Sequence, residues 1–130
     1  VSRTIKLKPA FLLDLVVSYD GTRLAGAVGG SVIVWEVATG KAILTLKGHQ
    51  QNVTSISFSP DGQRIVSGST DHTAKVWDVQ TGREMLTFKG HEGEVSSVLF
   101  SPNGQWIASG GSDKTVNLWD GRPREDLSGK

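Results

Sequence analysis

Residues 47–78 read KGHQQNVTSISFSPDGQRIVSGSTDHTAKVWD, and residues 89–120 read KGHEGEVSSVLFSPNGQWIASGGSDKTVNLWD. The two stretches align without a gap, so that Trp119 lies 42 residues after Trp77. Both begin with a Lys-Gly-His triplet and end with Trp-Asp, and Trp35 lies a further 42 residues upstream. A fixed period of this length is the sequence signature of a repeat architecture, which predicts one structural unit per repeat.

Each unit of the repeat reads as four short β-segments separated by turns. In the middle unit we expect these segments over residues 42–47, 53–58, 65–69 and 73–79. Residues 53–58 alternate apolar and small polar side chains, as a half-buried strand does. The Ser-Pro-Asp-Gly stretch that follows has the residue types of a tight turn. Because no window shows sustained helical spacing of apolar residues, we predict an all-β chain.

This repeat pattern resembles the WD-repeat family. The resemblance rests on Gly48-His49, on the Phe-Ser-Pro-Asp-Gly turn at 58–62, and on Trp77-Asp78, with matching elements in the next unit. It implies a β-propeller of four-stranded antiparallel blades, of which this chain holds about three as part of a larger ring. The propeller segment is expected over residues 1–120, with repeats at about 5–36, 47–78 and 89–120 and a polar tail or linker at 121–130. Kelch repeats run nearer 50 residues and carry a Gly-Gly pair that the matching turn lacks.

The resemblance also implies a buried, hydrogen-bonded tetrad of side chains in each of two blades. Such a chain runs from an indole N–H through a hydroxyl and an imidazole to a carboxylate, and it can satisfy every buried polar group. The implied tetrads are His49, Ser67, Asp71 and Trp77 in one blade, and His91, Ser109, Asp113 and Trp119 in the next.

The first repeat departs from this pattern. Lys6-Leu7-Lys8 stands where Gly-His is expected, and Val28-Gly29-Gly30-Ser31 stands where the turn aspartate is expected. Atypical end units are common in repeat arrays. We therefore expect this blade to fold without a tetrad, held instead by apolar side chains at Leu12, Leu15, Val17, Val32 and Val34.

Serine, histidine and aspartate together also occur in hydrolase active sites. Here the same set recurs in register in two successive units, and neither serine stands in a Gly-x-Ser-x-Gly elbow, so no catalytic residue is expected. The chain has no cysteine, and His72 has no partner at metal-ligand spacing, so no metal site is expected. The glycine pairs lack the Lys-Ser/Thr ending of a phosphate-binding loop, and no cofactor is predicted.

The composition narrows the classes of partner that this chain is expected to bind. The formal net charge is +1, from 14 basic and 13 acidic residues, which gives no broad field to attract nucleic acid or an anionic membrane. No stretch approaches the roughly 20 apolar residues that span a bilayer. We expect a soluble protein, with the cytoplasm as the default compartment and with proteins or peptides as partners.

The resemblance implies that partners bind at the narrow end of the propeller. The positions carried over are Phe11, Leu13, Asn52, Thr54, Thr70, Glu94, Ser96 and Ser112, with a core position as the alternative for Leu13. Trp106 replaces the arginine of the preceding unit and is an additional contact candidate. The predicted function is a protein–protein interaction scaffold without catalytic activity. The alternative is a regulatory module attached to a catalytic domain, such as a kinase or NTPase, outside this sequence.

The two ends of the chain predict an unfinished ring. Arg3–Leu7 reads as an outer strand with no blade before it, and the proline and charges of 121–126 offer no fourth strand to the last unit. Propellers have at least four blades, so three cannot close. The sequence, which does not begin with Met, therefore reads as a piece of a longer protein or as a chain that associates with a second copy by exchanging Arg3–Leu7.

Overall fold

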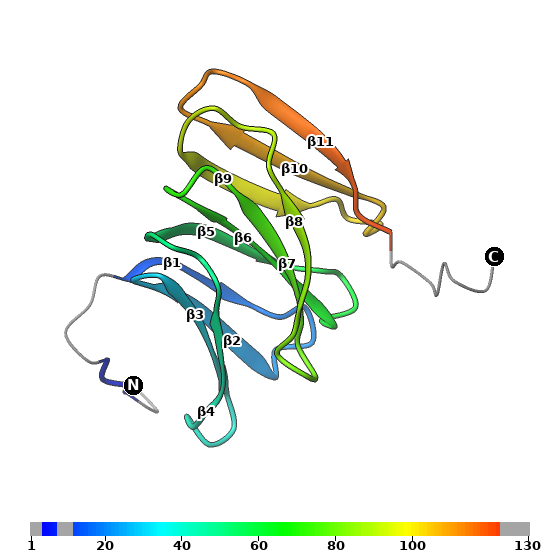
Figure 1. The fold of residues 1–130 in the computed structure, drawn as a ribbon. Helices are drawn as coiled ribbons and strands as arrows, with labels where there is room; N and C mark the ends of the chain where they lie inside the picture. The colour runs from blue at the N-terminus through cyan, green and yellow to red at the C-terminus, as the bar shows by residue number, and fades with distance from the viewer. Residues whose placement is uncertain (1–3, 8–11, 123–130) are drawn as a thin grey trace.

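The computed structural model describes residues 4–7 and 12–122, which hold eleven β-strands and no helix. Figure 1 shows these strands as three sheets stacked side by side in chain order. The strands are β1 (Leu12–Val17), β2 (Arg23–Val28), β3 (Ser31–Glu36), β4 (Ala42–Lys47), β5 (Val53–Phe58), β6 (Arg64–Ser69), β7 (Ala74–Asp78), β8 (Glu84–Phe88), β9 (Val95–Phe100), β10 (Trp106–Gly111) and β11 (Val116–Asp120).

The three sheets are antiparallel meanders, here called blades 1, 2 and 3. Blade 1 has the order β1-β2-β3-β4, blade 2 the order β5-β6-β7-β8, and blade 3 the order β9-β10-β11. The predicted all-β fold, a partial propeller of about three blades, is confirmed. Strands β4 and β5 have the bounds expected from sequence, whereas β6 and β7 differ by one residue at their ends.

Two apolar clusters hold the stack together. One lies between blades 1 and 2 and includes Val34, Leu46, Ile65 and Trp77. The other lies between blades 2 and 3 and is made of Val66, Ala74, Val76, Phe88, Val95, Val98, Phe100 and Ile107. Blade 2 thus contributes one sheet face to each cluster, because successive side chains of a strand point to opposite faces.

Hydrogen bonds between the innermost strands join the blades as well. The Ile56 N–H donates to the Asp14 carboxylate at 2.9 Å, and the Val98 N–H donates to the Ser55 hydroxyl at 3.1 Å. Asp14 and Ser55 occupy the same register position in β1 and β5, opposite Ala27 and Gly68 respectively. A side-chain acceptor at this position therefore links each blade to the inner strand of the next.

The apolar side chains expected to hold blade 1 do not all lie in the core. Val32 and Val34 are fully buried, as expected, but Leu12, Leu15 and Val17 are 45%, 51% and 56% exposed. The expectation for these three is wrong because they point away from blade 2, to a face that no described sheet covers. Alternation along a strand predicts an apolar face, but it does not predict what packs on that face.

The expected outer strand Arg3–Leu7 is not formed in this structure. Arg3 lies outside the described residues, and residues 4–7 are not in a strand. Blade 3 has three strands among the described residues, with β11 at its edge. The expected tail from 121 onward is described only as far as Arg122.

Candidate functional site

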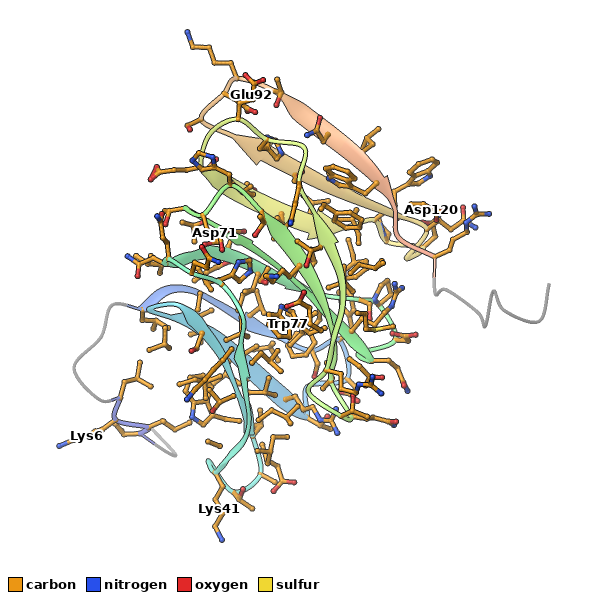
Figure 2. The ribbon with its side chains drawn as sticks, in the orientation of Figure 1. Lys6, Lys41, Asp71, Trp77, Glu92 and Asp120 are labelled. Carbon is orange, nitrogen blue, oxygen red and sulfur yellow. The ribbon has the colours of Figure 1, made fainter. Side chains whose placement is uncertain are left out.

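A continuous chain of hydrogen bonds crosses blade 2 from core to loop. The Trp77 Nε1–H donates to the Ser67 hydroxyl at 2.8 Å, and this hydroxyl lies 2.7 Å from His49 Nε2. His49 Nδ1 lies 2.9 Å from Asp71 Oδ2. The structure thus brings together all four residues of the implied tetrad, which come from β7, β6, the β4–β5 loop and the β6–β7 turn. Figure 2 shows Trp77 deep in the stack and Asp71 near its loop end.

The same chain recurs in blade 3. Trp119 Nε1–H donates to Ser109 at 2.8 Å, and Ser109 lies 2.8 Å from His91 Nε2. His91 Nδ1 lies 3.1 Å from both Asp113 carboxylate oxygens. Trp119 also stacks on Phe88 of blade 2, with ring centroids 4.4 Å apart. The repeated sequence unit therefore forms the same chain of hydrogen bonds in both blades.

A threonine extends each chain by one residue that the sequence reasoning missed. Thr73 donates its hydroxyl to Asp71 Oδ1 at 2.5 Å, and Thr115 donates to Asp113 Oδ1 at 2.7 Å. The signal was available, because both threonines stand two residues after the turn aspartate in matching units. In blade 2, Thr73 holds Oδ1 of Asp71 while Oδ2 faces the His49 imidazole.

The surroundings of Asp71 favour its charged form. Burial by itself would raise the pKa of Asp71, but hydrogen bonds from Thr73, His49 and the Gln50 N–H outweigh it and lower the pKa to about 2. Burial lowers the pKa of His49, partly offset by the Asp71 carboxylate. The Thr115 hydroxyl, acting against burial, lowers the pKa of Asp113. An ionised aspartate beside a buried imidazole is the state that completes the chain of donors and acceptors.

The glycine of each Gly-His pair lies against the tryptophan ring of the same blade. A Cβ atom at Gly48 would come within 2.8 Å of the Trp77 ring, and one at Gly90 would come within 2.6 Å of the Trp119 ring. Non-bonded carbon atoms prefer separations of about 3.5–4.0 Å. Glycine is therefore required here by close packing.

Blade 1 replaces the tetrad with apolar packing, as the sequence predicts. Gly26, which pairs with Ile33 as Ser67 pairs with Lys75, stands at the serine position. The Trp35 ring lies 2.9 Å from where a Cβ of Gly26 would stand, so the indole occupies the space of the missing hydroxyl. Trp35 is nevertheless buried.

The predicted partner positions lie at the tetrad end of the blades. Four are on loops (Asn52, Thr70, Glu94 and Ser112), and three are the second residues of β1, β5 and β9 (Leu13, Thr54 and Ser96). Figure 2 shows Asp71 and Glu92 at this end, with Asp120 at the other. The Thr70 N–H donates to the Asn52 carbonyl at 3.0 Å, and the Glu94 N–H donates to the Ser112 hydroxyl at 2.9 Å. The Ser112 N–H also donates to the Glu94 carbonyl at 2.8 Å, so hydrogen bonds hold the two neighbouring loops of each blade side by side.

These positions differ in their exposure. Asn52, Glu94, Ser96, Ser112 and also Leu13 are exposed. Thr70 and Thr54 are half-buried, and the Thr54 hydroxyl donates to the Val95 carbonyl of blade 3 at 2.5 Å. The Thr54 side chain therefore contributes to the contact between blades 2 and 3. Phe11 lies outside the described residues.

Two further side chains at the blade ends are open to solvent. His72 and Lys114 occupy the same place in the β6–β7 and β10–β11 turns, and both have positive φ, at 76° and 65°. Trp106, the additional contact candidate, is half exposed on β10 at the opposite end of its strand from these turns.

The family model described as "WD domain, G-beta repeat" matches residues 40–78 and 82–120. These two matches cover more than half of the chain and contain both tetrads. The chain belongs to the WD40 repeat family. WD40 repeats generally mediate protein–protein interactions.

Relatives within the family are much longer than this chain. The "Intraflagellar transport protein 122 homolog" of Xenopus tropicalis is 40% identical over 60 residues, which cover 46% of this chain and 5% of that protein. The "Eukaryotic translation initiation factor 3 subunit I" of Bombyx mori is 41% identical over 58 residues, which cover 45% of this chain and 18% of that protein. The solved structure "Crystal structure of RRP9 WD40 repeats" superposes with a TM-score of 0.86 at 26% identity, covering 91% of this chain and 38% of that one.

In this WD40 chain, the described residues hold no group of three or more histidine or acidic side chains that could bind a metal ion. Residues 4–7 and 12–122 likewise include no helix long and apolar enough to cross a membrane.

Proposed function

We propose that this chain is a protein–protein interaction scaffold that binds partners through the loop end of blades 2 and 3. The proposal rests on the contrast between two sets of polar side chains, one buried and one exposed. The side chains of the two tetrads are engaged in the interior, whereas Asn52, Glu94, Ser96 and Ser112 are exposed at one end of blades 2 and 3, where backbone hydrogen bonds join neighbouring loops. Exposed polar side chains on loops that a rigid scaffold holds in place are suited to protein recognition.

The name of one relative supports a role in protein–protein interaction without specifying a partner. One relative is by name a subunit of a translation initiation factor. A subunit works by contact with other chains. The exposed loop positions of this chain are small or polar, which suits a contact made of hydrogen bonds around a modest apolar centre.

A catalytic role for the serine–histidine–aspartate sets has little physical support. Their order and spacing do match a hydrolase triad, in which serine, histidine and aspartate are hydrogen-bonded in sequence. However, Ser67 is fully buried, and its oxygen already accepts the Trp77 indole N–H. A nucleophile must reach a substrate, and this hydroxyl has no access to one. We propose that the sets are structural, and that a fluorophosphonate probe for nucleophilic serines leaves Ser67 and Ser109 unlabelled.

Partner capture with two matched variants tests the scaffold proposal. Asn52→Arg/Ser96→Arg adds two positive charges at the loop end, and Gln63→Arg/Gln105→Arg adds two at exposed turns at the other end of the same blades. Proteins captured from an extract by the wild-type chain should be lost with the first variant and kept with the second. Equal capture by all three chains would overturn the proposed site.

We also propose self-association by strand exchange, in which Arg3–Leu7 of one copy forms the fourth strand of blade 3 in another. Two observations support it. Residues 4–7 form no strand, and blade 3 has three strands in the described part of the chain, where blades 1 and 2 have four. An unpaired edge such as β11 favours pairing with another chain. Deletion of residues 1–7 should remove this mode of association, as measured by light scattering.

A further inference from the structure

Blades 1 and 3 each present a large apolar sheet face that no described sheet covers. The open face of blade 1 carries Leu12, Leu15 and Val17. The open face of blade 3 carries Ser97, Leu99, Trp106, Gly110, Val116 and Leu118. Exposed apolar patches rimmed by polar residues commonly mark sites of protein contact.

The face of blade 2 that corresponds to the open face of blade 3 is fully covered. Val116 and Leu118 are 75% and 67% exposed, whereas Ala74 and Val76, at the same positions in blade 2, are 1% and 0% exposed. The difference arises because blade 3 packs on blade 2. The open face of blade 3 therefore has the chemistry of a surface that another blade covers.

The shape of the surface repeats as well. A Cβ at Gly68 of blade 2 would lie 2.6 Å from Val95 Cγ1 and 2.9 Å from Val98 Cγ1, so glycine leaves a hollow that blade 3 fills. Gly110 is the same position in blade 3, and a Cβ there would meet no atom within 4 Å. The residues that match Val95 and Val98 in blade 1 are Leu12 and Leu15, which are exposed.

Two polar contacts of the covered interface also have counterparts on the open faces. Ser55 accepts the Val98 N–H, and Ser97, at the same register position in blade 3, is exposed. The Arg64 guanidinium stacks on the Phe100 ring, 4.9 Å from its centroid. The corresponding pair on the open faces is Trp106 and Val17, two apolar side chains that are both exposed. The two open faces are thus complementary, and one chain carries both.

We infer that the open face of blade 3 docks the open face of blade 1 of a second copy of this chain. Leu12 and Leu15 of one copy fill the hollow at Gly110 of the other, and Val17 packs on Trp106. Because the contact joins different faces, two copies can satisfy both pairs by closing a six-bladed ring, within the four to eight blades of known propellers. This contact uses sheet faces, so it does not depend on the scaffold role or on strand exchange at the β11 edge.

The primary experiment is light scattering on the purified 130-residue chain between about 1 and 100 µM. The wild-type chain should form a discrete dimer. Gly110→Val should fill the hollow and raise the dimer dissociation constant at least tenfold, while the monomer keeps its fold because nothing lies within 4 Å of the new Cβ. A wild-type chain that stays monomeric, or a Gly110→Val chain that dimerises as well as wild type, would overturn the inference.

A charge exchange identifies the paired residues. Trp106→Glu and Val17→Lys should each be monomeric, because each places a charge in the apolar contact. Mixing the two variants should restore a heterodimer, since one interface then pairs glutamate with lysine and the other is wild type. Met85→Lys, on an exposed position of β8, is the matched control and should remain dimeric. Failure of the mixture to associate, with the control dimeric, would contradict the pairing.

Deletion of residues 1–7 separates the two modes of association. Face docking predicts that the shortened chain still dimerises and that Gly110→Val abolishes this dimer. A dimer that requires residues 1–7 but is indifferent to Gly110→Val would show strand exchange alone and overturn face docking.

Discussion

The indole N–H of Trp77 donates to the hydroxyl of Ser67, ten residues earlier on the neighbouring strand, at 2.8 Å. Both side chains are almost completely buried, and this bond is the inner end of a chain that reaches Asp71 at the loop. No buried side-chain nitrogen or oxygen among the described residues lacks a partner. The tetrad therefore ties two strands and two loops of the blade together without leaving a buried polar group unsatisfied.

Trp77→Ala should destabilise the chain by about 3–5 kcal/mol, from lost burial and the cavity that remains. Trp35→Ala should cost less, because the Trp35 ring packs on Gly26 in a blade without a tetrad. Urea unfolding of both variants measures the difference. Trp77→Phe keeps most of the burial and isolates the lost indole bond. Equal losses for Trp77→Ala and Trp35→Ala would argue against an energetic role of the tetrad.

Asp71→Ala should cost roughly 1–3 kcal/mol, because it leaves His49 Nδ1 and the Gln50 N–H without their acceptor. Thr73→Val, of nearly the same shape, should cost less, since it removes one donor to a carboxylate that keeps its other partners. Calorimetric melts of the two variants rank them. A larger loss for Thr73→Val than for Asp71→Ala would be inconsistent with Asp71 as the main acceptor.

Gly48→Ala should destabilise blade 2 by about 1–3 kcal/mol through overpacking, because the new methyl group would come within 2.8 Å of the Trp77 ring. The neighbouring exposed residue gives a control, and Lys47→Ala should change the unfolding free energy by less than about 0.5 kcal/mol. Unfolding curves that do not distinguish the two substitutions would contradict the close packing of Gly48.

Acidification should lower the stability in two steps. The pKa of His49 is lowered in the folded state, so the unfolded chain binds a proton more readily, and stability falls as the pH drops below about 6.5. The pKa of Asp71 is lowered to about 2, so its contribution is complete above about 4 and is lost as the pH falls toward 2. Unfolding free energies measured from pH 8 to pH 3 check both signs. Asp71→Asn should flatten the lower step, and a chain that gains stability between pH 7 and pH 5 would disprove the assignment for His49.

Much of the fold followed from the sequence because the repeat supplies its own alignment. Two matching units predicted the strands over 42–47 and 53–58 to the residue, and the resemblance to WD repeats placed the hydrogen-bonded side chains in one blade. The hydrogen bond from Ile56 to Asp14 was not foreseen, because β1 carries an aspartate where the matching strands carry serine.

The exposure of Leu12, Leu15 and Val17 could not be predicted from the strand itself. Their alternation indicates an apolar face, but its burial depends on a neighbouring sheet rather than on local residues. The same holds for Thr54, which was predicted as a partner-binding position but donates its hydroxyl to the Val95 carbonyl of blade 3. Contacts between blades are long-range, and a single sequence does not reveal them.

Asp71 helps to build the blade, whereas Asn52 and Ser96 are proposed to contact the partner. The most direct test is the dissociation constant of a purified partner, identified by capture, measured below the melting temperature of every variant. Asp71→Ala should leave the dissociation constant within about twofold of wild type, and Asn52→Arg/Ser96→Arg should raise it at least tenfold. The opposite result, with binding lost in Asp71→Ala and kept in Asn52→Arg/Ser96→Arg, would show that these residues do not have the roles proposed for them.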